Sequence, residues 1–513
     1  MEEPSGGEYR QPGDMDADSL RRYGHQVVDW MVDYLNGAQN NPILAQVTPG
    51  EISYSVGNRP PVQPEAMDTI LADLESLIMP GITHWNSAGF MGYFGISGSG
   101  PSILAEMFDA TLNVTRMLWR TAPAATELEQ VVLIWLREML GLPETMFGML
   151  YPNSAIVHAL VAAREAIPRG FIACSGLAGR ADLPPLCLYT SQEAHVSIDK
   201  AAVVLGIGLE GVRKIRTDAA FRMDTEDLKR IIQEDLRAGF LPFAVVATVG
   251  TTSTTSIDPV AAIADICKQY GLWLHVDAAY AGAAALVPEK RWILAGCERA
   301  DSFSVNPHKW LFTTFSCSAF FTRHPEMLKS ALGVTSDYLA NGEGDNQAMP
   351  DLMDYDFSLP HRFPALKLWM VIRYFGQEGL AKRIAEHCRL ATLLAEWIAA
   401  SADFECMAPV PLSVVCLRAH PLGIDQDSKL DTLNERIVQR VNASGNFFLS
   451  HTRIHGKYTI RVAISHIRTQ EIQVRGIWAA LQGSLQVELG MLRRQKMGHS
   501  ALHMLNLPTR SLL

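Results

Sequence analysis

The sequence predicts an α/β protein with a mostly parallel sheet, joined to a smaller α+β unit. Between about residues 100 and 375, short apolar runs alternate with helical stretches, a pattern typical of parallel strands covered by helices on both faces. After about residue 376, one long helical stretch precedes two separated strand-like runs and a further helix. Polar residues also follow several apolar runs, at the strand ends where such sheets bind ligands.

The composition is that of a globular protein with a large core. Of the 513 residues, 48% are hydrophobic and 19% are charged, and the formal net charge is -10. An acidic chain without a long basic run is unsuited to binding nucleic acid or anionic membranes. The N-terminus lacks a secretory signal, no apolar stretch approaches the ~18 residues of a membrane span, and the eight cysteines form no CxxC pair. We therefore expect a cytoplasmic protein with reduced thiols.

The chain divides into five segments. Residues 1–18 are acidic and rich in Gly and Pro, which predicts disorder. Residues 19–98 begin with the helical pattern "SLRRYGHQVVDWMVDYLNG", for which Ser19 is the expected cap and Gly37 the expected stop. Residues 99–376 are expected to form the large domain and residues 377–490 the small domain. Residues 491–513 are expected to be a flexible tail.

The large domain contains six clear strand candidates and three clear helices. The strands are predicted in "PLCLYTS", "GVRKIRTD", "FAVVATVG", "LWLHVDAAY", "SFSVN" and "CSAFFTR". The helices are predicted in "PSILAEMFDATLNV", "TELEQVVLIWLREMLG" and "DPVAAIADICKQYG". In the small domain, the long helix "GLAKRIAEHCRLATLLAEWIAAS" precedes the strands "PLSVVCLRA" and "YTIRVAISH".

An aspartate and a lysine follow two of these strands. Asp277 ends the strand in "LWLHVDAAY", and Lys309 follows the strand "SFSV" in "SVNPHKWLF". Considered separately, Asp277 would be interpreted as a turn aspartate and Lys309 as a solvated surface lysine. Together they suit pyridoxal phosphate, which needs a lysine for its Schiff base and a carboxylate beside its pyridine nitrogen. Burial and a nearby cation would lower the pKa of the lysine and make its amine nucleophilic.

Two further strand ends are expected at the same crevice. The cluster "TVGTTSTTSID" places Thr252 after one strand, and "LYTSQEAHVSIDKAA" places His195 after another. A lone histidine is more often structural, but this one lies at the fourth strand end directed at one crevice, so we favour a role at the cofactor ring. Asn306 and His308 can donate hydrogen bonds to a phosphate.

The motifs resemble the group II decarboxylases that use pyridoxal phosphate, in particular the aromatic L-amino-acid decarboxylases. The resemblance covers roughly residues 19–485 and follows the family's order through "GHQVVDWMVDYL", "ITHWNSAGFMGYF", "ATELEQVVLIWL", "SQEAHVSIDKAA", "ATVGTTSTTSID", "HVDAAYAG", "NPHKWL" and "RFPALKLWMVIRYFG". It implies the aspartate-aminotransferase-like fold of these enzymes, fold type I. It also implies a homodimer with active sites at the subunit interface, in which residues 19–98 wrap the partner.

The resemblance also implies a role for each cofactor residue. Lys309 would carry the internal aldimine, Asp277 would pair with the pyridine nitrogen, and Ala279 and His195 would lie against the ring. Thr252 would lie near the ring hydroxyl, and Asn306 and His308 near the phosphate. An aromatic L-amino acid would lose carbon dioxide through a quinonoid and leave as the amine.

Tyr338 matches the loop tyrosine that delivers a proton to Cα in the family. The related aldehyde synthases carry phenylalanine there or change the histidine, so retention of Tyr338 and His195 favours simple decarboxylation. An aldehyde synthase, or a decarboxylase for another amino acid, remains an alternative. Aromatic residues of the substrate pocket are matched by Trp85, Tyr93 and Phe94, with core aromatics at a dimer interface as the alternative reading. Where some members have a second aromatic wall, this chain has Arg116 and Met117.

The stretch expected to bind the phosphate departs from the family. It reads "GMLYPNSAIVHALVAARE" and lacks the usual run of small residues. Ser154 and Ala155 still offer a hydroxyl and amides at a helix start, and Asn153 is a candidate cap, but Pro152 removes one amide donor. An inactive homologue is therefore a further alternative. Proline also replaces a usual glycine at position 360, near the expected substrate pocket.

Two other motifs are set aside. The stretch "GIGLEG" (206–211) matches a dinucleotide fingerprint, but a helical stretch precedes it and a strand-like run follows, the reverse of the required order. The stretch "HTRIH" (451–455) lacks the glutamate of a metalloprotease motif. No metal site is expected.

Overall fold

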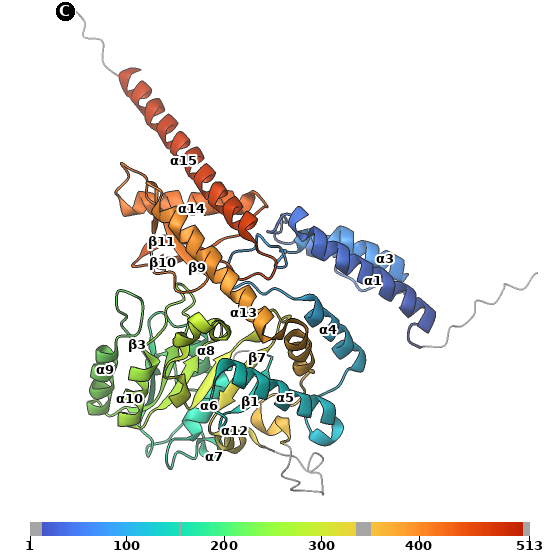
Figure 1. The fold of residues 1–513 in the computed structure, drawn as a ribbon, viewed down its shortest axis with the longest axis vertical. Coiled ribbons are helices and arrows are strands. Elements are labelled where there is room, and N and C mark those ends of the chain that lie inside the picture. Colours follow the sequence, from blue (N-terminus) through green and yellow to red (C-terminus); the bar gives the residue numbers. More distant parts are fainter. Residues whose placement is uncertain (1–12, 153–154, 335–349, 506–513) are drawn as a thin grey trace, which may run out of the picture.

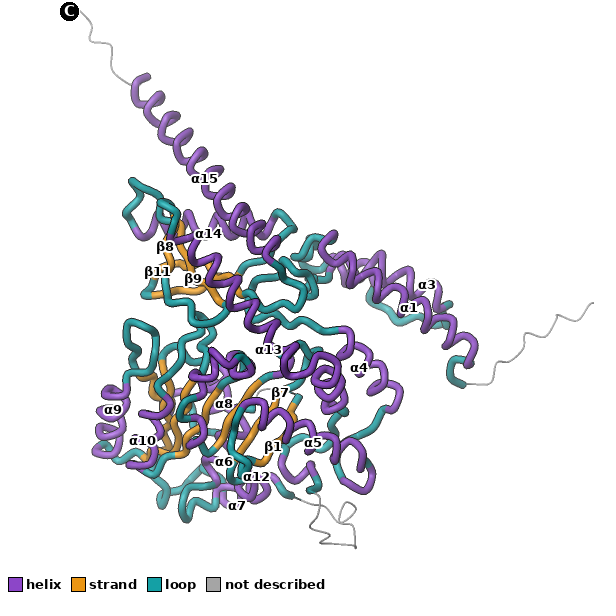
Figure 2. Tube along the Cα trace, viewed as in Figure 1, coloured by secondary structure: helices purple, strands orange, loops and turns teal. Residues whose placement is uncertain are grey.

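A seven-stranded sheet lies at the centre of the large domain (Figures 1 and 2). The computed structural model describes residues 13–152, 155–334 and 350–505, except the side chains of residue 39 and residues 495–505. In spatial order, the strands are β1 (Phe147–Tyr151), β7 (Ser318–Thr322), β6 (Ser302–Val305), β5 (Trp273–Asp277), β4 (Leu241–Thr248), β2 (Leu186–Ser191) and β3 (Val212–Ile215). Strands β3, β2, β4, β5 and β6 are mutually parallel, whereas β7 runs antiparallel to both β6 and β1.

Both faces of this sheet are buried, as the continuous apolar strands predict. On β4, Val245 and Ala247 belong to the hydrophobic core on one face, and Ala244 and Val246 to the core on the other. The first core is completed by α5 (Pro123–Leu140), α9 (Thr225–Arg237), α10 (Val260–Tyr270) and the first half of α13 (Pro364–Ala399). The second is completed by α6 (Ile156–Glu165), α7 (Ile172–Ser175), α8 (Ser197–Val204) and α12 (Pro325–Leu332).

The small domain is a four-stranded antiparallel sheet packed against helices. Its order is β10 (Ser450–Ile454), β11 (Lys457–Ala463), β9 (Val414–Ala419) and β8 (Phe404–Cys406), with α14 (Asp427–Ala443) and α15 (Glu471–Leu505) alongside. Helix α13 continues from the large domain into this one and is kinked at Gly376, where φ is 64°. Only glycine adopts such an angle at little cost, which explains why the kink is at this residue. Gly376 is also the last residue of the predicted large domain.

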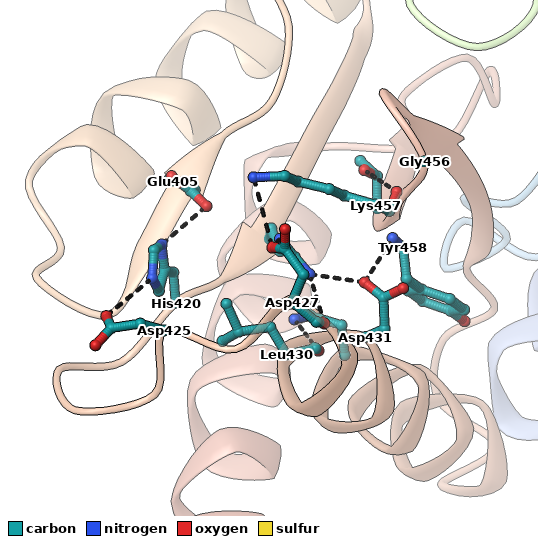
Figure 3. A network of polar contacts seen from close by, with 12 residues as sticks. Glu405, His420, Asp425, Asp427, Leu430, Asp431, Gly456, Lys457 and Tyr458 are labelled. Carbon is teal, nitrogen blue, oxygen red and sulfur yellow. Dashed lines mark hydrogen bonds and ion pairs between the residues drawn. The ribbon is translucent and has the colours of Figure 1, made fainter.

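A polar network ties the β10–β11 hairpin to α14 (Figure 3). The buried Arg418 guanidinium donates to Asp427 Oδ1 at 2.8 Å and to Asp431 Oδ1 at 2.7 Å. Asp431 also accepts from the backbone N–H of Tyr458 at 2.9 Å and from Arg453 Nη1 at 3.1 Å. The network therefore fixes the hairpin whose second strand, β11, extends toward the large domain.

The N-terminal segment forms a helical arm that projects from the side of the molecule on which α4 (Gly100–Leu112) lies (Figure 1). The arm contains α1 (Ala17–Gly37), the short α2 (Glu51–Val56) and α3 (Met67–Asp73). Tyr23 donates to Asp68 Oδ2 at 2.8 Å, which joins α1 to α3. None of the residues of α1 is buried within the single chain.

The structure corrects three details of the sequence-based description. The cap of α1 is Asp16, whose side chain accepts from the N–H groups of Asp18 and Ser19, so the predicted cap Ser19 lies inside the helix. Strand β1 had no counterpart among the predicted strands, because its five residues directly precede the altered phosphate turn. Helix α15 continues to Leu505, well into the segment 491–513 that was expected to be a tail. Residues 1–12 of the expected disordered segment lie outside the described residues.

The stretch "GIGLEG" lies between α8 and β3 and includes the short 3-10 turn Leu209–Gly211. It therefore has the helix-then-strand order that excludes a dinucleotide fingerprint. Among the described residues, no helix is both long and apolar enough to cross a membrane.

Candidate active site

A cavity of about 170 Å³ opens at the carboxyl ends of the central strands. The neighbouring residues Thr248, Asp277 and Ser304 stand in register on β4, β5 and β6 and share its floor. The cavity brings together the described cofactor residues that the sequence predicted: Ala155, His195, Thr252, Asp277, Ala279, Asn306, His308 and Lys309.

Asp277 is held in place by the backbone that follows β5. The N–H of Ala279 donates to Asp277 Oδ1 at 3.1 Å, which fixes the orientation of the carboxylate. His275 lies two residues earlier on the same strand and is buried beside Ser302, with Nδ1 2.9 Å from its Oγ. Burial lowers the pKa of His275 to about 4, so this neighbour stays uncharged at neutral pH. An uncharged His275 does not compete with a ligand as an ion-pair partner of the Asp277 carboxylate.

Lys309 lies in the short helix α11 (Pro307–Trp310), directly after β6. Its N–H donates to the carbonyl of Asn306 at 2.9 Å, and its Nζ lies 5.4 Å from the centre of the Phe94 ring. Burial lowers the pKa of Lys309; Asp277 opposes this shift, whereas Arg461 adds to it. A lysine with a lowered pKa has more neutral amine at physiological pH, as a nucleophile requires.

His195 reaches the cavity from the turn before α8. Its Nδ1 accepts from the Ser197 N–H at 3.2 Å, and the Ser197 hydroxyl lies 2.9 Å from the same atom. Because Nδ1 is an acceptor, the proton of the neutral ring is on Nε2. Burial, followed by the charge of Lys309, lowers the pKa of His195. The ring is therefore neutral at physiological pH and suited to lie flat against a cofactor ring.

Thr252 is presented by a tightly hydrogen-bonded loop after β4. The N–H groups of Gly250 and Thr251 both donate to the carbonyl of Ser256, at 2.9 and 3.0 Å. Gly250 has φ of 90°, and a Cβ there would lie 2.4 Å from the Cβ of Ala281. The loop therefore needs glycine at this position, and its compactness holds Thr252 at the rim of the cavity.

The cavity contains buried hydroxyls that have no hydrogen-bond partner in the described part of the chain. Thr248 Oγ1 and Ser318 Oγ are both buried, both belong to lining residues, and neither has a hydrogen-bond partner among the described residues. An unsatisfied buried polar group costs ~1–3 kcal/mol, so these hydroxyls call for a polar ligand. A carboxylate, a nucleophilic lysine, a neutral imidazole and free hydroxyls form the donor set that pyridoxal phosphate requires.

A family model described as the pyridoxal-dependent decarboxylase conserved domain matches residues 49–420. The chain belongs to this family. It is 36% identical over 478 residues to a phenylacetaldehyde synthase of Arabidopsis thaliana, covering 91% of this chain and 96% of that one. It is 37% identical over 482 residues to tyrosine decarboxylase 2 of the same plant, covering 91% and 87%. The crystal structure of Oryza sativa TDC with PLP and tryptamine matches with a TM-score of 0.89 and 32% identity, covering 93% and 99%.

Family membership confirms several expectations from the sequence. The protein is a group II pyridoxal-phosphate-dependent decarboxylase with the fold type I architecture, and pyridoxal phosphate is its cofactor. It acts on a small-molecule amino acid. The decarboxylase relatives support an active enzyme over the alternative of an inactive homologue.

The expected substrate residues are only partly gathered at the cavity. Phe94 lines it. Trp85 stacks on Phe90 with ring centres 4.2 Å apart, and Tyr93 is 55% exposed, so both lie beside the cavity rather than on its wall. Met117 is half-buried outside the lining, where its carbonyl accepts from the N–H of Met353.

Three expected residues lie outside the described part of the chain: Asn153, Ser154 and Tyr338. The companion position Arg116 does not add charge to the pocket. Its side chain is buried, and Nη1 lies 2.6 Å from Glu129 Oε1. Within the described ranges, no group of three His, Cys, Asp or Glu side chains is arranged to hold a metal ion.

Arg461 is a site residue that the sequence analysis missed. It lies on β11, is buried, and its Cζ stands 4.7 Å from the centre of the Phe94 ring. Its Nε donates to the Ser253 carbonyl at 3.2 Å, and its Nη1 donates to the Tyr93 carbonyl. A charged residue inside the apolar run "YTIRVAISH" was the available signal, because buried arginines need specific partners.

Proposed function

We propose that the protein decarboxylates an aromatic L-amino acid to the corresponding amine and carbon dioxide. The observation that carries this proposal is the meeting of Lys309, Asp277 and His195 with the Phe94 ring in one cavity. An aromatic wall suits a flat apolar side chain. The named relatives support the same substrate class: a phenylacetaldehyde synthase, a tyrosine decarboxylase, and a TDC structure that contains tryptamine.

Each proposed catalytic group has a separate task. When bound, pyridoxal phosphate supplies an electron sink for the electron pair left as the Cα–carboxylate bond breaks. The Lys309 amine would hold the cofactor until the substrate amine replaces it. The Asp277 carboxylate would keep the proton on the pyridine nitrogen, and the neutral His195 ring would restrict the ring position. Thr252, Asn306 and His308 would supply hydrogen bonds at the rim, beside the backbone of Ala279. Tyr338 would then deliver a proton to Cα.

The rate of amine formation from different amino acids tests the substrate class. Tryptophan, tyrosine, phenylalanine and their hydroxylated forms should be decarboxylated, with kcat/KM at least about tenfold above that for glutamate or valine, because only aromatic side chains match an aromatic wall. Carbon dioxide release should equal amine release. Equal or faster turnover of an acidic or aliphatic amino acid would refute the aromatic assignment.

Replacing Tyr338 with phenylalanine is expected to divert the reaction from amine to aldehyde. Without the phenolic proton donor, Cα would remain unprotonated for longer, and dioxygen with water would oxidise it to the aldehyde instead. The products would then be aldehyde, carbon dioxide, ammonia and hydrogen peroxide, with one dioxygen consumed per turnover. The measurement is the ratio of aldehyde to amine, together with dioxygen uptake.

Tyr355→Phe is the matched control, because this nearby tyrosine packs against Phe147 and does not line the cavity. The control should make amine alone. If Tyr338→Phe makes no more aldehyde than the wild type, the proton-donor role is wrong. If the wild type already makes chiefly aldehyde, the protein is an aldehyde synthase like its phenylacetaldehyde synthase relatives.

We also propose that the protein is a homodimer whose second copy covers the N-terminal arm and α4. On α1, Leu20 and Val32 are 62% and 52% exposed, and on α4 Phe108 and Leu112 are each 57% exposed. Apolar surface of this extent usually marks an interface. A dimer would also bring a second chain toward the incomplete aromatic wall around Trp85.

Light scattering of the holoprotein should give twice the mass of one chain across micromolar concentrations. A monomer at those concentrations would contradict the proposal.

A cytoplasmic location is proposed on the basis of the eight cysteines, all of which are unpaired.

A further inference from the structure

Ser318 stands at the end of the cavity where α6 begins. It is the first residue of β7 and pairs with Tyr151, the last residue of β1. Its side chain is fully buried, its Oγ has no hydrogen-bond partner among the described residues, and it lines the cavity together with Pro152 and Ala155. A buried hydroxyl without a partner is costly unless a ligand satisfies it.

This end of the cavity has the character of an anion site. Helix α6 has ten residues, and its N-terminal amides carry the positive end of the helix dipole. Pro152 precedes it and has no N–H to offer. His308 also lines this cavity, and its Nδ1 is held by the backbone of Cys317, 2.7 Å from the carbonyl oxygen and 3.0 Å from the nitrogen. The Ser318 hydroxyl would add a donor from β7 at this end of the cavity.

A buried cluster holds the described residues that flank the turn. The Tyr151 hydroxyl donates to the Tyr355 carbonyl at 2.8 Å, and its ring stacks on His158 with centres 3.6 Å apart. His158 Nε2 lies 3.1 Å from Asp356 Oδ1, and His361 Nε2 lies 2.9 Å from Asp356 Oδ2. Burial alone would raise the pKa of Asp356, but the hydrogen bonds from both histidines outweigh it and hold that pKa well below its usual value.

The strand that enters the turn is fixed by a second buried pair. Arg116 Nη2 donates to the Leu150 carbonyl at 2.9 Å, and the Leu150 N–H donates to Glu129 Oε1 at 2.9 Å. The side chains of Arg116 and Glu129 are 1% and 0% exposed. Separating such a pair leaves an uncompensated buried charge, so the backbone of Leu150 has little freedom to move. Residues on both sides of the turn are thus anchored independently of the small residues that this sequence lacks.

We propose that Ser318 donates a hydrogen bond to the cofactor phosphate, and that Asp356, acting through His158, positions the start of α6 for the same phosphate. Ser318 is a binding residue in this proposal, and Asp356 is a positioning residue. The proposal rests on the assignment of the cavity to pyridoxal phosphate. It explains how a chain without the usual small-residue turn holds the phosphate end of its cofactor.

The test compares two ligands that differ only in the phosphate. Apoprotein is titrated with pyridoxal phosphate and separately with pyridoxal, and binding is followed by the absorbance of the lysine-bound ligand. In Ser318→Ala, affinity for pyridoxal phosphate should fall about 10- to 100-fold, the value of one hydrogen bond to a charged group. Affinity for pyridoxal should stay within about twofold of the wild type. Thr322→Val is the control, because it removes a buried hydroxyl at the far end of the same strand, where Oγ1 donates to the Asp301 carbonyl.

Asp356→Asn should show the same split with a smaller effect, about 3- to 10-fold for pyridoxal phosphate alone, because it weakens a positioning contact rather than a direct one. Asp354→Asn is its control, since Asp354 lies two residues away and pairs with Lys329 at 3.1 Å. The melting temperature of each apoprotein shows whether the variant folds as the wild type does.

Three outcomes would overturn the proposal. Unchanged affinity of Ser318→Ala for pyridoxal phosphate would remove Ser318 from the phosphate site. An equal loss of affinity for pyridoxal phosphate and pyridoxal would show that Ser318 acts only through the fold. If Ser318→Ala loses affinity for pyridoxal phosphate alone but Asp356→Asn does not, Asp356 has no positioning role. Failure of the cofactor assignment is a different result, because wild type would then bind neither ligand and Lys309→Ala would change nothing.

Discussion

Replacing Lys309 with alanine is expected to abolish decarboxylation, with kcat lowered by more than about a thousandfold. Alanine removes the amine that forms a covalent bond to the cofactor and that exchanges it with the substrate. Burial lowers the pKa of Lys309 and so raises the fraction of nucleophilic amine, and no other described lysine lines the cavity. The measurements are amine formation and the absorbance of the bound cofactor, whose lysine-bound band should disappear.

Lys290→Ala is the matched control. This lysine is also half-buried, and its Nζ donates to the Pro411 carbonyl at 2.8 Å, away from the cavity. The control should keep both the absorbance band and the activity. A Lys309→Ala protein that keeps the band and turns over substrate would show that another amine holds the cofactor.

Replacing Asp277 with asparagine is expected to lower kcat by about a hundredfold or more, with a much smaller change in KM. Asparagine keeps the shape and can still accept the Ala279 N–H, but it carries no charge. The pyridine nitrogen then loses the anion that favours its protonation, and each unit of lowered pKa there corresponds to ~1.4 kcal/mol. The electron sink weakens, so the loss should fall on bond breaking rather than on substrate binding.

The pH dependence of the cofactor's absorbance distinguishes this role from a structural one. In Asp277→Asn, the form with a protonated pyridine nitrogen should be lost at a lower pH than in the wild type, while the melting temperature stays close to the wild-type value. Asp265→Asn, which changes a 74% exposed aspartate paired with Arg299, should alter neither quantity. An unshifted spectrum with reduced stability would assign Asp277 to the fold instead.

The sheet and its ligand-binding edge could be predicted because the strands are apolar over their whole length. Runs such as "FAVVAT" bury both faces, and a residue at the end of such a strand can only face the crevice or the turn. That constraint is why Asp277 and Lys309 were placed correctly relative to each other from sequence alone. The antiparallel direction of β7 could not be predicted, because an apolar run has the same sequence pattern in parallel and antiparallel pairings.

The contacts that cross between segments could not be predicted. Arg461 contacts the cavity residue Phe94 from β11, more than 150 residues after Lys309 in the chain, and no local sequence pattern predicts such a contact. Ser318 was missed because a serine at the start of an apolar strand is ordinary, and only its unsatisfied burial distinguishes it. Trp85 and Tyr93 lie beside the cavity, as expected if a second chain completes its aromatic wall in the proposed dimer. A wall built by two chains cannot be predicted from one sequence.

Arg461 has a consequence for how the whole chain responds to its cofactor. Through its contacts with Tyr93, Phe94 and Ser253, the small domain, the N-terminal segment and the loop after β4 meet beside one cavity. A ligand bound in that cavity would contact Phe94 and Thr252, and Arg461 joins both of their segments to the small domain. Its binding free energy would therefore add to the unfolding free energy of all three parts. At a thousandfold excess of cofactor over its Kd, that linkage amounts to about 4 kcal/mol. Cofactor supply would then set the stability of the folded protein as well as its activity.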